Sequence, residues 1–217
     1  MMDPFRLCVA LGPLALYFLA IGLKNFSRTP RVVSGTRDTA ALGFATAGLL
    51  LVGPIELLLP ALPLRVTAYV WLLLLVLYVL FVSLVVLLLA PRLVVYNVSY
   101  EQIRPALAEV VNQLDAEARW AGGSVSLPRL NVEFYLDDYP FIRNVSLIST
   151  GTPQSYSGWR QLERRLREQL RTSVETVPNA WGVGALTTAV VILGRMGWLV
   201  YAHPEQITQG FVEMMRL

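Results

Sequence analysis

Four apolar blocks divide the chain. They cover residues 4–23, 39–59, 66–90 and 180–202, and each has the ~20 mainly apolar residues that a helix needs to cross a ~30 Å hydrocarbon layer. The third block contains no charge. The pattern predicts an α-helical polytopic membrane protein with four transmembrane helices, three of them within residues 1–90.

Two of these blocks have a second interpretation. The first has features of a signal peptide, although its apolar stretch is long and no clear cleavage site precedes Lys24. The fourth contains Arg195, which costs ~3 kcal/mol near a bilayer centre, so a buried or interfacial helix is the alternative. Trp181 and Trp198 near its ends favour a span, because aromatic rings settle at membrane interfaces.

Residues 91–178, between the third and fourth spans, have a soluble pattern. A short strand at 92–98 precedes a helix opened by Ser99 and Gln102 at capping-box spacing and ended at 121–123. Apolar and polar residues alternate over 130–137, a turn follows at Asp137–Pro140, and a second strand covers 141–148. With a last helix after Ser155, the order predicts a small α+β (β-α-β-β-α) two-layer domain of three strands.

Composition agrees with a membrane class. The chain is 55% hydrophobic and 15% charged, with mean hydropathy +0.53, whereas about a quarter of a soluble domain is charged. Cys8 is the only cysteine and His203 the only histidine. No disulfide framework or thiolate metal site is therefore expected.

The basic residues of the loops predict an orientation. The loop after the first span carries Lys24, Arg28, Arg31 and Arg37, whereas the loop between the second and third spans carries only Arg65. The positive-inside rule then places residues 91–178 in the cytoplasm and both termini outside the cell membrane. Residues 179–217 are expected to hold the fourth span and a short interfacial helix with an apolar edge from Ile207 to Leu217.

Two charges inside the spans define a candidate site. Glu56 and Arg195 each lie ~23–26 Å along a helix that starts on the inner side, so both should reach the same depth. We predict an intramembrane ion pair between them, shared with Arg6; separate snorkelling to the outer headgroups is the alternative. Gly12-Pro13 and Gly53-Pro54 predict helix kinks, and Gly43 and Gly48 predict close helix packing.

The last helix of the soluble domain has a basic face. Arg160, Arg164, Arg167 and Arg171 recur at helical spacing just before the fourth span, which predicts contact with anionic lipid headgroups or a solvated, orientation-setting face. The domain has ten basic and ten acidic residues and lacks aromatic–basic interleaving, so nucleic-acid binding is not expected.

The residues show no catalytic constellation. Asp137-Asp138 is explained by a turn, no cofactor or metal site is expected, and the N-x-S sequons at Asn25, Asn97 and Asn144 would face the cytoplasm. The sequence therefore favours a non-enzymatic scaffold or docking component of a membrane assembly, with a protein partner or a second copy. A small oligomeric channel or transporter using Glu56 and Arg195 is the alternative, and a membrane-bound enzyme comes third.

Overall fold

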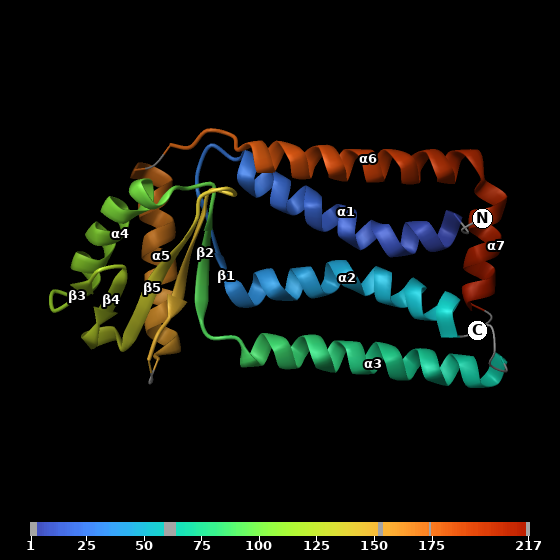
Figure 1. Cartoon of the computed structure of the whole chain (residues 1–217), viewed down its shortest axis with the longest axis horizontal. Helices are drawn as coiled ribbons and strands as arrows, with labels where there is room; N and C mark the ends of the chain where they lie inside the picture. The colour runs from blue at the N-terminus through green and yellow to red at the C-terminus, as the bar shows by residue number, and fades with distance from the viewer. Residues whose placement is uncertain (1–3, 59–63, 152–153, 174, 216–217) are drawn as a thin grey trace. The chain divides into compact units, whose positions relative to one another are not determined.

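The computed structural model describes residues 4–58, 64–151, 154–173 and 175–215, with side chains left out at 54–58, 64–68, 70–71 and 213–215. The described chain is mostly helical and holds one small antiparallel sheet (Figure 1). It forms two compact units. Unit 1 comprises Met1–Ala20, Thr39–Leu88 and Ala185–Leu217, and unit 2 comprises Ile21–Asp38 and Leu89–Gly184.

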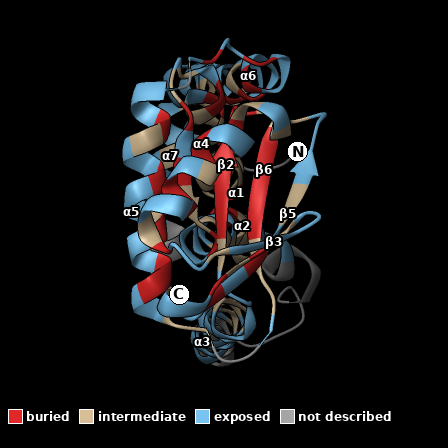
Figure 2. Ribbon diagram, turned by 90° about the vertical axis from the view of Figure 1, so that its left-hand side faces the viewer, coloured by how far each residue is buried: buried red, intermediate tan, exposed pale blue. Residues whose placement is uncertain are grey.

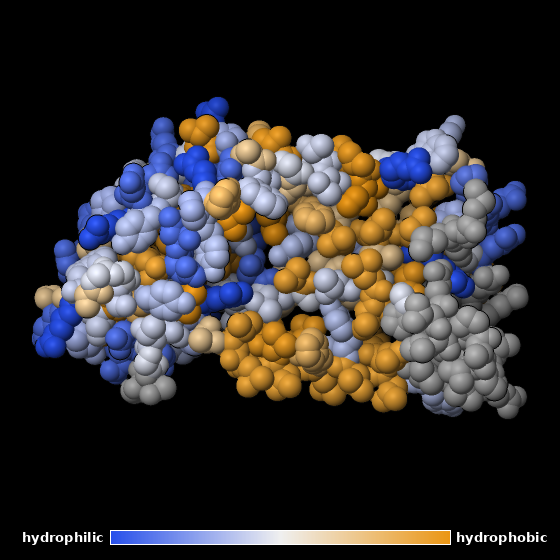
Figure 3. Space-filling view, in the orientation of Figure 1, coloured by the Kyte–Doolittle hydropathy of each residue, from blue (hydrophilic) through white to orange (hydrophobic). Residues whose placement is uncertain are grey.

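Long apolar helices make up unit 1. They are α1 (Pro4–Phe26), α2 (Gly35–Leu58), α3 (Leu64–Leu88), α6 (Ala180–Ala202) and the shorter α7 (Pro204–Met215), and one end each of α1, α2 and α6 belongs to unit 2. Among the described residues, α1 and α6 are long and apolar enough to cross a membrane, and Leu72–Leu88 of α3 is a shorter apolar stretch. Their surface is largely hydrophobic in Figure 3. These helices are the feature of the structure that indicates membrane association.

Glycines on α2 allow close helix contacts within unit 1. A Cβ on Gly48 would lie 2.3 Å from the carbonyl oxygen of Val9 on α1, and a Cβ on Gly43 would lie 2.6 Å from Val82 Cγ1 on α3. Tyr78 of α3 donates its hydroxyl to the carbonyl of Gly43. Small residues let helix backbones approach where lipid offers no hydrophobic driving force, so α2 packs against both neighbours.

Unit 2 is built on a six-stranded antiparallel sheet with the order β1-β2-β6-β5-β4-β3. The strands are β1 (Arg31–Ser34), β2 (Arg92–Tyr96), β3 (Arg119–Ala121), β4 (Ser124–Leu127), β5 (Val132–Tyr139) and β6 (Asn144–Ser149). Two helices, α4 (Tyr100–Leu114) and α5 (Tyr156–Ser173), lie on one face of it (Figure 1), and a short 3-10 turn, η1 (Pro128–Leu130), precedes β5.

The core of unit 2 fills the space between the sheet and these two helices. Alternate strand residues such as Val95, Phe134 and Leu147 point into it, and Leu162 and Leu166 face them from α5. Leu93 through Tyr96 are all buried, so β2 is covered on both faces (Figure 2). At about 0.8 kcal/mol per buried methylene, this core is the main stabilising contribution to the unit.

The sheet has three strands more than the sequence predicted. β1 comes from the loop after the first apolar block, and β3 and β4 form a hairpin at 119–127, over the predicted end of the helix and the segment that follows it. The helix ends at Leu114, and Gly122, with φ +62°, makes the hairpin turn instead. Glycines are typical both of a helix C-terminus and of a hairpin turn, so the sequence pattern did not distinguish the two.

One further detail of the predicted domain needs correction. Asp137 and Asp138 belong to β5, which runs to Tyr139, and the turn lies over Pro140–Arg143. The helix α4 starts at Tyr100, directly after Ser99, and Pro105 lies inside it. The Gln102 side chain does accept a hydrogen bond from the Ser99 amide at 3.2 Å, as the capping-box spacing predicts.

Candidate functional site: a basic groove at the edge of the sheet

A cavity of about 790 Å³ opens on unit 2 beside the edge strand β1. Its walls come from the last turn of α1, from β1 and from the second half of α5. The lining residues are Leu23, Lys24, Thr29, Pro30, Arg31, Val32, Val33, Arg167 and Arg171. We call this cavity the basic groove. Its volume lies within the range of small-molecule sites, ~300–1,000 Å³.

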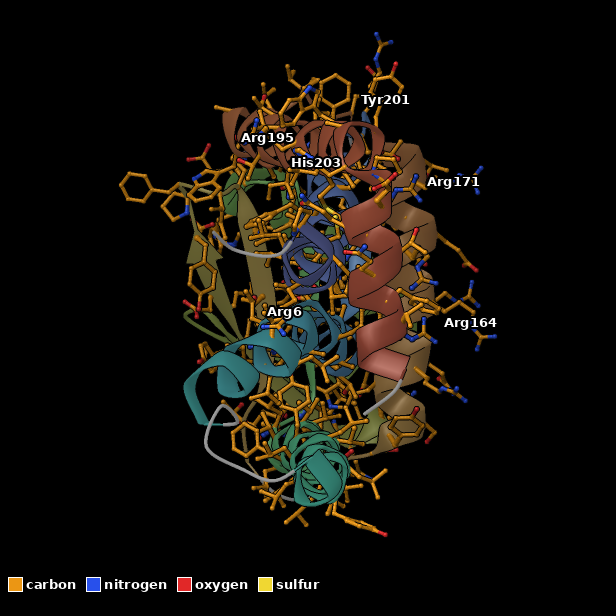
Figure 4. All side chains as sticks on the ribbon, turned by 90° about the vertical axis from the view of Figure 1, so that its right-hand side faces the viewer. Arg6, Arg164, Arg171, Arg195, Tyr201 and His203 are labelled. Atoms are coloured by element: carbon orange, nitrogen blue, oxygen red, sulfur yellow. The ribbon has the colours of Figure 1, made fainter. Side chains whose placement is uncertain are left out.

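Packing of α5 fixes the arginines of the groove. Leu162, Leu166 and Leu170 bury one face of the helix in the core. Arg160, Arg164, Arg167 and Arg171 are spaced by four, three and four residues, so they form one row along the adjoining, exposed face. Figure 4 shows Arg164 and Arg171 projecting from the same side of α5. We call these four residues the arginine row.

Arg167 also covers the free edge of the sheet. Its guanidinium donates to the carbonyl oxygen of Val32 at 3.3 Å and lies 2.6 Å from the carboxylate of Glu163. A carbonyl on an edge strand is a site for pairing with another strand, and here an arginine satisfies it. The β1 edge is therefore blocked at its centre by a side chain of the same unit.

The cations of the groove differ in their partners. Lys24 lies 3.7 Å from Asp38 and 4.9 Å from the centre of the Tyr96 ring, whose hydroxyl donates to Asp38 at 2.6 Å. Arg31 and Arg171 are exposed, and neither forms an ion pair with a residue that the structure describes. Arg31 and Arg171 therefore give the groove positive charge that no carboxylate in the described part of the chain pairs with.

A buried cluster of amides and hydroxyls connects the chain segments that build this unit. Asn97, at the end of β2, donates to the carbonyl of Ser27 at 2.9 Å and to the hydroxyl of Thr176 at 3.1 Å. Asn179 donates through its side chain to the carbonyl of Ile142 at 2.8 Å. We call this set the amide cluster. It joins the segment after α1, the end of β2 and the segment before α6.

The three sequons fall within or beside this cluster. Asn25, Asn97 and Asn144 are 3%, 0% and 6% exposed, and Asn144 accepts a hydrogen bond from the amide of Asn97. A glycan on any of them would need the space that the fold fills with protein. The sequence could not show this, because the three asparagines are far apart along the chain.

The predicted intramembrane site is only partly described. The side chains of Glu56 and Pro54 lie outside the described residues. Arg195 is exposed on α6 and lies over the ring of Trp198, 5.2 Å from its centre. Figure 4 shows Arg6 and Arg195 apart from each other. The ion pair therefore stays a prediction.

The predicted kink residues lie inside continuous helices. Pro13 lies within α1, which is a single helix from Pro4 to Phe26, and a Cβ on Gly12 would lie 3.5 Å from Met196 Cε of α6. Nothing comes within 4 Å of a Cβ built on Gly53. Gly12 therefore lies at a contact between α1 and α6, whereas the space beside Gly53 is not filled by other atoms that the structure describes.

Asp137 and Asp138 do not converge on a metal site. They are neighbours in β5, so their side chains point to opposite faces of the sheet. Tyr139 donates its hydroxyl to Asp137 at 2.7 Å, and this bond raises the pKa of the phenol above its ordinary value. Among the described residues, no group of three or more histidine, cysteine or acidic side chains is placed to hold a metal ion.

Sequence reasoning missed Asp38, Tyr96 and the amide cluster. The prediction did not include β1, because Val32 and Val33 are only a short β-branched pair in a loop that is otherwise mainly basic and polar. Such a pair after a proline is a short strand signal. Read in that way, it would have brought Lys24 and Arg31 to the edge of the sheet.

Comparisons with protein-family models, with curated proteins and with solved structures found no match for this chain. The functional interpretation therefore rests on the basic groove, the arginine row and the apolar helices. Together they form a basic surface on a unit that is continuous in sequence with helices long and apolar enough to cross a membrane.

Proposed function

We propose that this chain is a non-enzymatic, four-span membrane protein whose unit 2 docks an acidic protein partner as a scaffold component of a membrane assembly. The carrying observation is the arginine row. Arg160 and Arg164 are exposed and extend the row along α5 beyond the lining of the groove. Arginine forks pair with carboxylates in a planar, bidentate geometry, so the row suits an acidic segment.

Four spans are supported by helix length. At ~1.5 Å per residue, the 24 residues of α2 and the 25 of α3 each reach ~36 Å, enough for a ~30 Å hydrocarbon layer. The basic loop residues Lys24, Arg28, Arg31 and Arg37 all belong to unit 2. The positive-inside rule then puts unit 2 in the cytoplasm and both termini outside.

The amide cluster supports a scaffold role. It connects residues at the end of α1 with those before α6 by hydrogen bonds, and it does so inside unit 2. A docking surface on a unit that is held together in this way keeps its own shape. The close contacts of Gly43 and Gly48 favour packing as the role of α2 over lining a transport path.

Purification from native membranes in mild detergent tests the proposal. We expect a stoichiometric acidic partner with the full-length protein, released by salt because rim charges act through screened electrostatics. The double variant R160E/R164E should lose it, whereas R119E, a charge reversal on the exposed β3, should keep it. Repeated recovery of the wild-type protein alone, or equal loss in both variants, contradicts docking through the arginine row. A second copy of the chain as the partner would show as a dimer.

A further inference from the structure

We infer that the basic groove binds the phosphate of an anionic glycerophospholipid from the leaflet that faces unit 2, with Arg31 and Arg171 holding the phosphate. The inference rests on the membrane-spanning part of the proposed function and not on the protein partner. It assigns a ligand to a cavity whose lining begins in a candidate span.

The end of α1 places the groove at the depth of lipid phosphates. Leu23 and Lys24 line it from the last turn of this helix, which is 23 residues long and apolar enough to cross a bilayer. Lipid phosphates lie just beyond the end of the hydrocarbon layer, where the last turn of such a helix emerges. A headgroup can therefore enter the groove while its acyl chains stay in the membrane.

The apolar wall of the groove continues towards the lipid. Leu23 is 57% exposed and Phe26, in the same last turn of α1, is 48% exposed. Pro30 and Val33 are further apolar residues of the lining. A free phosphate would use only the charged groups, whereas the glycerol and upper acyl carbons of a lipid also cover these apolar side chains.

The charges suit a single phosphodiester. Arg31 and Arg171 have no ion-pair partner among the described residues, and each guanidinium offers the fork that phosphate oxygens accept. Lys24 and Arg167 are already engaged by Asp38 and Glu163, so they position the site more than they hold the ligand.

An extended acidic peptide fits the same groove less well. Adding a strand to β1 needs free main-chain groups along the edge. The carbonyl of Val32, at the centre of the groove wall, already accepts a hydrogen bond from Arg167. A compact phosphate between Arg31 and Arg171 leaves that bond in place, whereas a paired strand would have to break it.

Lipid retention by the purified full-length protein tests the inference. The protein in mild detergent is mixed with equal amounts of phosphatidylglycerol and phosphatidylcholine, and lipid adducts are counted by native mass spectrometry. A basic residue near anionic lipid contributes ~1 kcal/mol, so two of them predict a preference for phosphatidylglycerol of roughly tenfold or more. R31Q/R171Q should lose most of this preference.

The matched control is R160Q/R164Q, which also removes two positive charges, but from the part of the arginine row that lies outside the groove. It should keep the lipid preference, and both double variants should match the wild-type melting temperature without added lipid. No preference in the wild type, or equal loss in both variants, overturns the inference. Displacement of the lipid by an equal concentration of inorganic phosphate would assign the site to free phosphate and overturn it too.

The two proposals fail in different ways. If the purified protein shows a lipid preference but no partner ever co-purifies with it, the lipid site stands and docking is contradicted. If the partner is lost only in R160E/R164E and the wild-type protein shows no lipid preference, docking stands and the lipid site is contradicted. Release of the chain from membranes by alkaline carbonate would contradict the membrane-spanning part that both share.

Discussion

The side-chain amide of Asn97 donates to the main-chain carbonyl of Ser27 across 70 positions of sequence, at 2.9 Å. Asn97 also has φ +58°, in the left-handed region that asparagine tolerates better than most residues. One residue therefore ends β2, turns the chain and attaches it to the segment that follows α1. Its identity as asparagine matters both for the backbone and for the hydrogen bonds.

Replacing Asn97 separates these two roles. Asn97→Ala loses both hydrogen bonds and forces a Cβ residue to φ +58°, whereas Asn97→Gly loses the bonds alone. We expect the glycine variant to be destabilised by about 2–3 kcal/mol and the alanine variant by about 1 kcal/mol more. Thermal unfolding of the full-length protein in detergent measures the difference, and equal losses would contradict the backbone role.

Gly48 and Gly53 form a matched pair on α2. A Cβ on Gly48 would overlap the carbonyl of Val9, whereas a Cβ on Gly53 meets nothing within 4 Å. We expect Gly48→Ala to destabilise the protein by about 1–3 kcal/mol, because backbone must move. Gly53→Ala should be neutral or stabilising, since alanine is the better helix former. Thermal unfolding in detergent compares them, and equal effects would contradict the α1–α2 contact.

Asp115 is a structural carboxylate that sequence patterns did not reveal. Its side chain is buried and accepts hydrogen bonds from the main-chain amides of Glu117 at 2.9 Å and Arg129 at 2.8 Å. Asp115→Ala leaves both amides without that acceptor and should cost about 3 kcal/mol in the free energy of unfolding. Glu117→Ala, which breaks only the exposed pair with Arg129, should change little. Chemical denaturation in detergent measures both.

Variants at Arg195 and its neighbours distinguish two explanations for the positive charge within the apolar helix α6. If it pairs with Glu56, the double charge swap should restore protein levels that either single swap lowers. If its contact with Trp198 dominates, Trp198→Leu should destabilise the protein by about 0.5–2 kcal/mol and the double swap should give no rescue. Membrane protein levels and thermal stability, measured on the same variants, decide between the two.

Phe141 offers a test of orientation. It is 90% exposed in the turn between β5 and β6, so a cysteine placed there is accessible without disturbing the core. In a Cys8→Ala background, Phe141→Cys should react in intact cells with a membrane-permeant maleimide and not with an impermeant one. Labelling by the impermeant reagent would place unit 2 outside and reverse the predicted topology.

Local patterns predicted the elements that depend on neighbours in sequence. The helical period that buries Leu162, Leu166 and Leu170 and the alternation around Phe134 are local signals, and both elements are present. The basic groove depends on Arg31 and Arg171 lining the same cavity, and it is the pairing of β1 with β2 that brings β1 into unit 2. Such a contact between distant segments leaves no periodic trace in a single sequence.

The place of β1 in the chain has a consequence for biosynthesis. It precedes α2 and α3, but its pairing partner β2 follows them, so unit 2 stays incomplete until both helices have been made. At ~5–20 residues per second, β2 leaves the ribosome several seconds after β1. During that delay β1 lacks the strand it pairs with. In the four-span topology that we propose, membrane insertion of the two intervening helices brings the nascent chain back to it.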